Sequence, residues 1–130
     1  MTDADRLLLV DQWLKFSADH MATAQVGDVA ASIRCYHAQQ AAETAMKAAL
    51  VFDGRDFPKT HDLEVIAALI APKFPEAGMA AQLDWLTEWA MSRRYPGPRS
   101  HPTAADTERA VRLAQSIVEA ARAYIEDPRA

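Results

Sequence analysis

Apolar residues recur at intervals of three and four along most of the chain, which is the period of one face of an α-helix. The first such stretch covers about residues 3–24 and the second about residues 28–52. In the second stretch the repeating positions carry mainly alanine, together with Cys35 and Phe52. Side chains this small let neighbouring helices approach closely, so we expect the second helix at the centre of a helical bundle.

The second half of the chain predicts three further helices. Thr60 or Asp62 can cap a short helix that ends at Pro72, and a fourth helix opens at Pro75. The last helix starts after Thr103, where an aspartate three residues later resembles a capping box. We therefore predict an all-α fold, an up-down four-helix bundle with an additional short helix (about five helices), forming a single domain over residues 1–130.

Composition narrows the function classes. The net charge of −4 and the pI near 5.5 argue against a polycation that coats DNA, so any contact with nucleic acid must be a local patch. The single cysteine, Cys35, excludes an intramolecular disulfide and agrees with a reducing compartment. The charged first residues lack the apolar core of a signal peptide, and no stretch is apolar enough to span a membrane. We expect a cytoplasmic protein without membrane contacts.

Residues 93–101 read Arg-Arg-Tyr-Pro-Gly-Pro-Arg-Ser-His, with three arginines, one histidine and no acid. The prolines make a continued helix improbable there, and arginine binds phosphate oxygens well. Arg93, Arg94 and Arg99 are therefore predicted to bind phosphate. The alternative is solvation at a helix C-terminus, where a cation gains about 0.3–1 kcal/mol from the helix dipole. That alternative explains Arg93 fully and Arg99 least, because Arg99 lies beyond the prolines.

Polar residues share one face of the second helix, at positions Tyr36, Gln40, Glu43 and Lys47. One interpretation is a groove that orients a base or ribose, with Tyr95 as a further candidate. The other is an interhelical hydrogen-bond network in which Glu43 and Lys47 form an i,i+4 pair. The spacing leaves both interpretations open.

Histidines and tryptophans add two weaker signals. His20, His37 and His61 lack the spacing of a metal site, so we expect neither a metal nor another cofactor. Trp85 and Trp89 lie four residues apart, and could belong to the core, to a base-stacking surface or to a dimer interface. Three tryptophans are many for so small a bundle, which favours an interface for at least one of them.

Several of these features occur in the order and spacing of a known family. They are Trp13-Leu14, residues 36–43 (Tyr-His-Ala-Gln-Gln-Ala-Ala-Glu), Lys47, Gly54, Pro58, His61-Asp62-Leu63 and Arg94-Tyr95-Pro96. Together they resemble a HEPN domain along nearly the whole chain, from Trp13 to about Tyr124. The resemblance implies a homodimer, a nucleotide or RNA ligand, and a minimal nucleotidyltransferase as partner in a toxin–antitoxin module.

The resemblance also raises the question of catalysis. Many HEPN proteins are metal-independent endoribonucleases with an arginine followed, after four to six residues, by a histidine; here six residues separate Arg94 from His101. The histidine would move a proton of the ribose 2′-hydroxyl, and the arginine would offset charge on the phosphate. The intervening Pro-Gly-Pro run departs from the catalytic pattern. We therefore expect a nucleotide- or RNA-binding partner subunit, with a ribonuclease toxin as the first alternative and a non-catalytic helical adaptor as the second.

Overall fold

The structure, a computed structural model, describes residues 1–70, 74, 79–98 and 101–126. Within these ranges it contains five α-helices and no strand, which confirms the predicted all-α fold. The helices are α1 (Asp3–Ala24), α2 (Ala31–Phe52), α3 (Leu63–Ala68), α4 (Ala80–Thr87) and α5 (Ala104–Glu126), and two short 3-10 turns, η1 (Glu88–Ala90) and η2 (Ser92–Arg94), follow α4.

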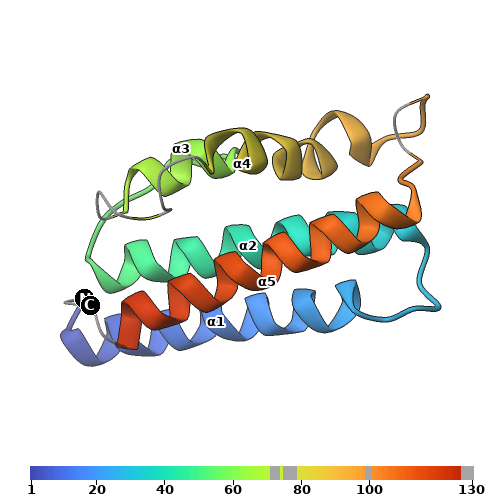
Figure 1. The fold of residues 1–130 in the computed structure, drawn as a ribbon. Coiled ribbons are helices and arrows are strands. Elements are labelled where there is room, and N and C mark those ends of the chain that lie inside the picture. The colour runs from blue at the N-terminus through green and yellow to red at the C-terminus, as the bar shows by residue number, and fades with distance from the viewer. Residues whose placement is uncertain (71–73, 75–78, 99–100, 127–130) are drawn as a thin grey trace.

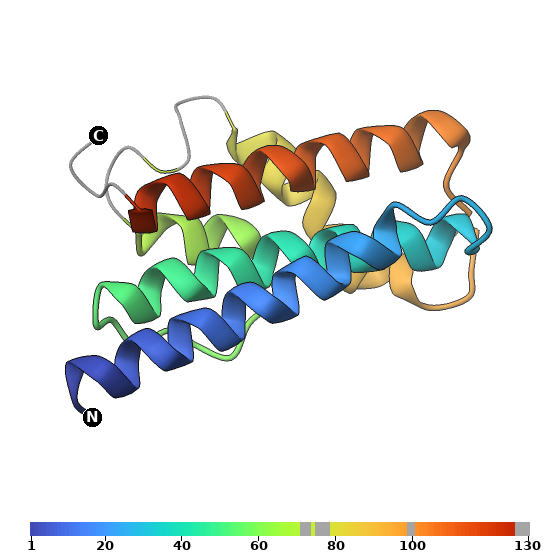
Figure 2. The ribbon, with the colours of Figure 1, turned by 90° about the horizontal axis from the view of Figure 1, so that it is seen from below.

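The long helices α1, α2 and α5 lie alongside one another, and α3 and α4 run along the remaining side of the bundle (Figure 1). The chain reverses direction from α1 to α2, again from α2 to α3 and α4, and once more before α5, as an up-down bundle requires (Figures 1 and 2). The described part of the fourth helix runs from Ala80 and gives way to 3-10 geometry at Glu88. Its predicted start at Pro75 lies outside the described residues. No helix of the described ranges is long and apolar enough to cross a membrane.

Local sequence accounts for most helix starts. At α1, Thr2 and Asp5 form a capping box, in which each side chain accepts a hydrogen bond from the other's backbone N–H at 3.1 Å. Thr103 and Asp106 do the same at α5, with both distances 3.0 Å, as predicted. Asp62 caps α3 by accepting from the backbone N–H of the next turn. These side chains satisfy N–H groups that a helix start otherwise leaves unpaired.

The two ends of α2 follow different rules. The helix starts at Ala31, three residues later than predicted, because a turn bond from the Val29 N–H to the Val26 carbonyl (3.3 Å) holds the preceding residues. At its other end, Gly54 has a φ of 69°, and the Arg55 N–H reaches back to the Leu50 carbonyl at 2.9 Å. A positive φ favours glycine, so Gly54 suits the position at which this helix ends.

Helix α2 forms the centre of the bundle. Every residue from 38 to 51 is buried, because α1 and α5 pack along it and α3 and η1 cover it from a third side. The alanines make this close approach feasible. Cys35 is buried as well, and burial raises the pKa of its thiol, which favours the unreactive protonated form. Trp89 is only 1% exposed and belongs to the core rather than to an exposed interface.

Candidate functional site

The segment after α4 leaves the helical bundle in steps. Helix α4 tightens into η1, the backbone departs from helical angles at Met91 (φ −114°, ψ −109°), and after η2 it is extended at Tyr95. Arg93 lies at the start of this segment. Its Nε donates to the Glu88 carboxylate at 2.7 Å, and its guanidinium carbon lies 5.0 Å from the centre of the Trp89 ring. The charge of Arg93 is therefore offset within the protein.

The structure describes only some of the other site residues that the sequence predicts in this segment. Tyr95 is 64% exposed, and His101 is exposed just before the cap of α5. The side chain of Arg94 and the whole of Arg99 lie outside the described residues. The phosphate-binding role of the arginines and the pairing of Arg94 with His101 therefore remain predictions.

The polar face of α2 forms a buried network that we call the Glu43 cluster, made of Gln39, Gln40, Glu43, Lys47 and His61. Glu43 accepts from Lys47 Nζ at 2.9 Å on one oxygen. Its other oxygen lies 2.7 Å from His61 Nδ1 and 3.3 Å from the side-chain nitrogens of both glutamines. A carboxylate only accepts, so Nδ1 of His61 carries the proton when Glu43 is ionised.

The cluster joins α2 to the loop after it and to α1. Gln39 also donates to the His61 carbonyl oxygen at 2.8 Å, which fixes the loop that precedes α3. The Lys47 ammonium lies 5.8 Å from the centre of the Trp13 ring and 5.4 Å from that of Phe57. Both distances are within cation–π range.

These contacts favour the network interpretation of the polar face. Gln40, Glu43 and Lys47 are each at most 9% exposed and bond to one another, so they do not line an open groove. Tyr36 lies nearer the start of α2, with its ring edge-on to His37. A role for these residues and Tyr95 in nucleotide binding remains a prediction. Helical spacing did not predict Gln39 as part of this polar face. It joins the Glu43 cluster because α2 is covered on several sides.

A second polar contact links α1 and α2. His20 Nδ1 and His37 Nδ1 lie 2.8 Å apart, so the two rings share one proton between them. Burial, and then the neighbouring His37, lowers the pKa of His20, and burial lowers the pKa of His37. Among the described residues, no three His, Cys, Asp or Glu side chains come together as a metal site.

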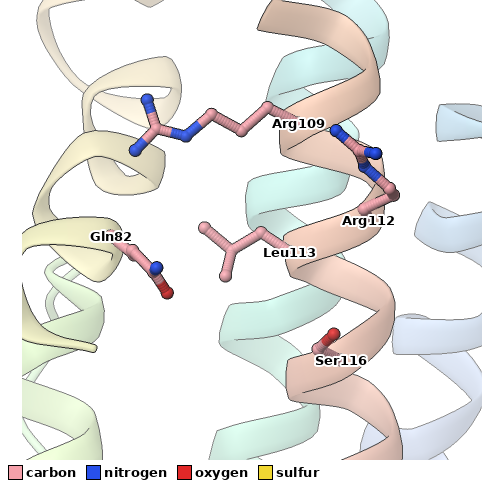
Figure 3. A pocket seen from close by; sticks show the side chains of 5 residues that line it. All are labelled: Gln82, Arg109, Arg112, Leu113 and Ser116. Atoms are coloured by element: carbon pink, nitrogen blue, oxygen red, sulfur yellow. The ribbon is translucent and has the colours of Figure 1, made fainter. Parts of the chain in front are cut away.

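A solvent-open hollow of about 210 Å³ lies between α4 and α5. It is lined by Gln82, Arg109, Arg112, Leu113 and Ser116 (Figure 3). We call it the α4–α5 hollow. Neither of its arginines forms an ion pair within the described part of the chain. Our sequence analysis missed it, although Arg109, Arg112 and Ser116 follow one another at helical spacing.

Two comparisons place the chain among known proteins. The family model of the HEPN domain matches residues 20–124. The crystal structure of an archaeal HEPN homologue superposes with a TM-score of 0.73 at 24% identity, covering 89% of this chain and 97% of that one, which shows a shared fold. No curated protein gives a significant match to the sequence. Since the family model spans most of its length, the chain belongs to the HEPN domain family.

Proposed function

We propose that this HEPN protein binds nucleotide or RNA through the segment that follows α4, as a homodimeric partner subunit of a minimal nucleotidyltransferase in a toxin–antitoxin-type module. The family supplies the expectation of the ligand and the partner. The segment contributes arginines that hold phosphate oxygens and an aromatic ring on which a base can stack. Arg94 and Arg99 are the proposed phosphate contacts, since Arg93 is engaged by Glu88.

One observation carries the proposal. The backbone departs from helical angles at Met91, α5 begins only at Ala104, and Tyr95 between them is largely exposed. The same segment carries three arginines and no acid, so an aromatic ring and several positive charges lie close together in the sequence. Exposed aromatic and basic residues in one short segment are typical of a single-strand binding surface.

The test is binding of a fluorescein-labelled single-stranded RNA of about 12 nucleotides, followed by fluorescence anisotropy. We expect Arg94→Gln/Arg99→Gln to weaken binding, and Tyr95→Ala to weaken it further by about 1–3 kcal/mol if one base stacks there. The control is Lys15→Gln/Arg122→Gln, which removes the same charge from α1 and the far half of α5. Equal affinities for the arginine variant and this control contradict the proposed site.

The partner is tested separately. A minimal nucleotidyltransferase encoded beside this gene, co-expressed with a tagged copy of the chain, is expected to co-elute with it from a size-exclusion column. Elution of the two as separate peaks, or a gene neighbourhood without such an enzyme, contradicts the pairing. Light scattering on the chain alone then measures whether it is a dimer.

Metal-independent cleavage of RNA is the second candidate function. Its support is the exposed position of His101 at the end of the same segment, where a neutral imidazole could take a proton from a 2′-hydroxyl. A ribonuclease assay with a metal chelator tests it. Unchanged cleavage by His101→Ala removes His101 from the mechanism, and no cleavage by the wild-type protein removes the candidate function itself.

A further inference from the structure

The α4–α5 hollow carries two arginines that the proposed function leaves unused. Figure 3 shows Arg109 stretching from α5 toward α4, with the Leu113 side chain between α5 and Gln82. The Arg109 guanidinium carbon lies 4.0 Å from the centre of the Trp85 ring. An aromatic ring that covers one face of a guanidinium holds it in place and leaves its in-plane N–H groups available to an anion.

The acidic residues of α4 and η1 do not neutralise these arginines. Asp84 faces Glu64 of α3, and their shared hydrogen bond raises the pKa of Glu64. Glu88 pairs with Arg93 at 2.7 Å. Arg109 and Arg112 are both exposed and keep their charge for an external group.

We propose that the α4–α5 hollow binds the phosphates of a single RNA strand, as a second contact beyond the segment after α4. Arg109 and Arg112 supply the charge, and the Gln82 amide and Ser116 hydroxyl supply neutral hydrogen bonds. This combination of arginine with neutral polar side chains is characteristic of nucleic-acid backbone contacts. The inference rests on the proposed RNA binding, because it extends the path of that same ligand.

The dimensions of the hollow favour a strand over a free mononucleotide. Its volume of about 210 Å³ is below the roughly 300–1,000 Å³ of pockets that enclose small ligands. Ser116 follows Arg109 by seven positions along α5, a rise of about 10 Å at about 1.5 Å per residue. That length exceeds one phosphate group and suits a backbone that runs along α5.

The experiment measures anisotropy of a labelled single-stranded RNA of about 12 nucleotides over a range of salt concentrations. The variants are Arg109→Gln/Arg112→Gln, Arg112→Gln alone, and the charge-matched control Lys15→Gln/Arg122→Gln. Arg112→Gln guards against misfolding, because the structure describes no hydrogen bond or ion pair of Arg112 that it would break. Thermal melts by circular dichroism confirm that each variant is folded.

We expect the double variant to bind RNA about tenfold more weakly than the control at low salt. The slope of log K against log salt should shrink by about 0.7 for each arginine that contacts a phosphate, so by about 1.4 for the pair. The single variant should show about half of the change in slope.

Two results overturn the inference alone. One is a double variant that matches the control in affinity and slope while the wild-type protein binds RNA. The other is a polyglutamate peptide of equal length that binds the hollow as tightly as the RNA does, since that would assign the site to an acidic protein. If the wild-type protein binds no RNA, both the inference and the proposed function fail.

Discussion

The Glu43 cluster and the α4–α5 hollow are both polar, but the charges of the cluster are paired within the protein and the charges of the hollow are not. In the cluster, Glu43 accepts from four neighbouring side chains inside a helix that is buried on several sides. In the hollow, two exposed arginines have no ion pair within the described residues, although one is held in place by Trp85. A buried charge that is paired within the protein stabilises the fold. An exposed charge that is held in place but has no ion pair is available to bind a ligand.

The reason lies in solvation. An unpaired ion in a protein interior is destabilised by several kcal/mol, so a buried charge persists only with a complete set of partners. An exposed guanidinium is stabilised by water until an anion replaces that water, and its cost to the fold is small. Substitutions in the two regions should therefore separate stability from binding.

The largest effect is expected from Glu43→Ala. It leaves the charged Lys47 side chain, which is only 10% exposed, without its partner, and removing one partner of such a buried pair costs about 3–5 kcal/mol. Denaturant unfolding measures the change in the free energy of unfolding. Glu43→Gln/Lys47→Met removes both charges and should recover part of the loss. A loss below about 1 kcal/mol for Glu43→Ala would show that the cluster stabilises the fold no more than an exposed surface ion pair does.

A smaller effect is expected at the His20–His37 contact. The two rings can form their hydrogen bond only while at least one of them is neutral and can accept it. Both pKa values are lowered in the folded state from an unfolded value near 6.5, so the unfolded chain binds more protons below that pH. The contribution of this contact to the free energy of unfolding is therefore complete above about pH 6.5. It is lost as the pH falls toward the pKa values of the two histidines in the folded state.

Unfolding free energies measured from about pH 7.5 to about pH 5 test this. The free energy of unfolding should fall less steeply with decreasing pH in His37→Gln than in the wild type, because the substitution removes one of the two histidines. His101→Gln, at an exposed histidine, should leave the decline as it is. An equal slope in wild type and His37→Gln would mean that other groups control the acid response.

The smallest effect is expected at the pair Lys15–Asp19. It has the same i,i+4 spacing as Glu43–Lys47, but its side chains are 75% and 67% exposed. Solvent screening limits such a pair to about 0.3–0.5 kcal/mol. Lys15→Ala should therefore change the free energy of unfolding by no more than that, and a loss comparable to that of Glu43→Ala would erase the distinction between the two regions.

The sequence predicted the parts of the fold that local chemistry determines. The capping box at Thr103 and the alanine-rich α2 follow from short-range rules, and both appear where expected. The roles of Arg93 and Arg109 could not be predicted. The partner of Arg93 depends on where the helix breaks at Met91, and that of Arg109 depends on how α5 packs beside Trp85. The first contact is local but depends on the break in the helix, and the second is a tertiary contact, so helical periodicity encodes neither.

The most direct test of the contrast is an NMR titration of isotope-labelled protein with the single-stranded RNA, following side-chain signals of arginine and glutamine. We predict progressive shifts of the Arg109 and Arg112 Nε–H signals, with the side-chain amides of Gln39 and Gln40 unchanged. Shifts concentrated on Gln39 and Gln40, with the two arginines unmoved, would contradict the assignment of the Glu43 cluster to the fold and of the α4–α5 hollow to the ligand.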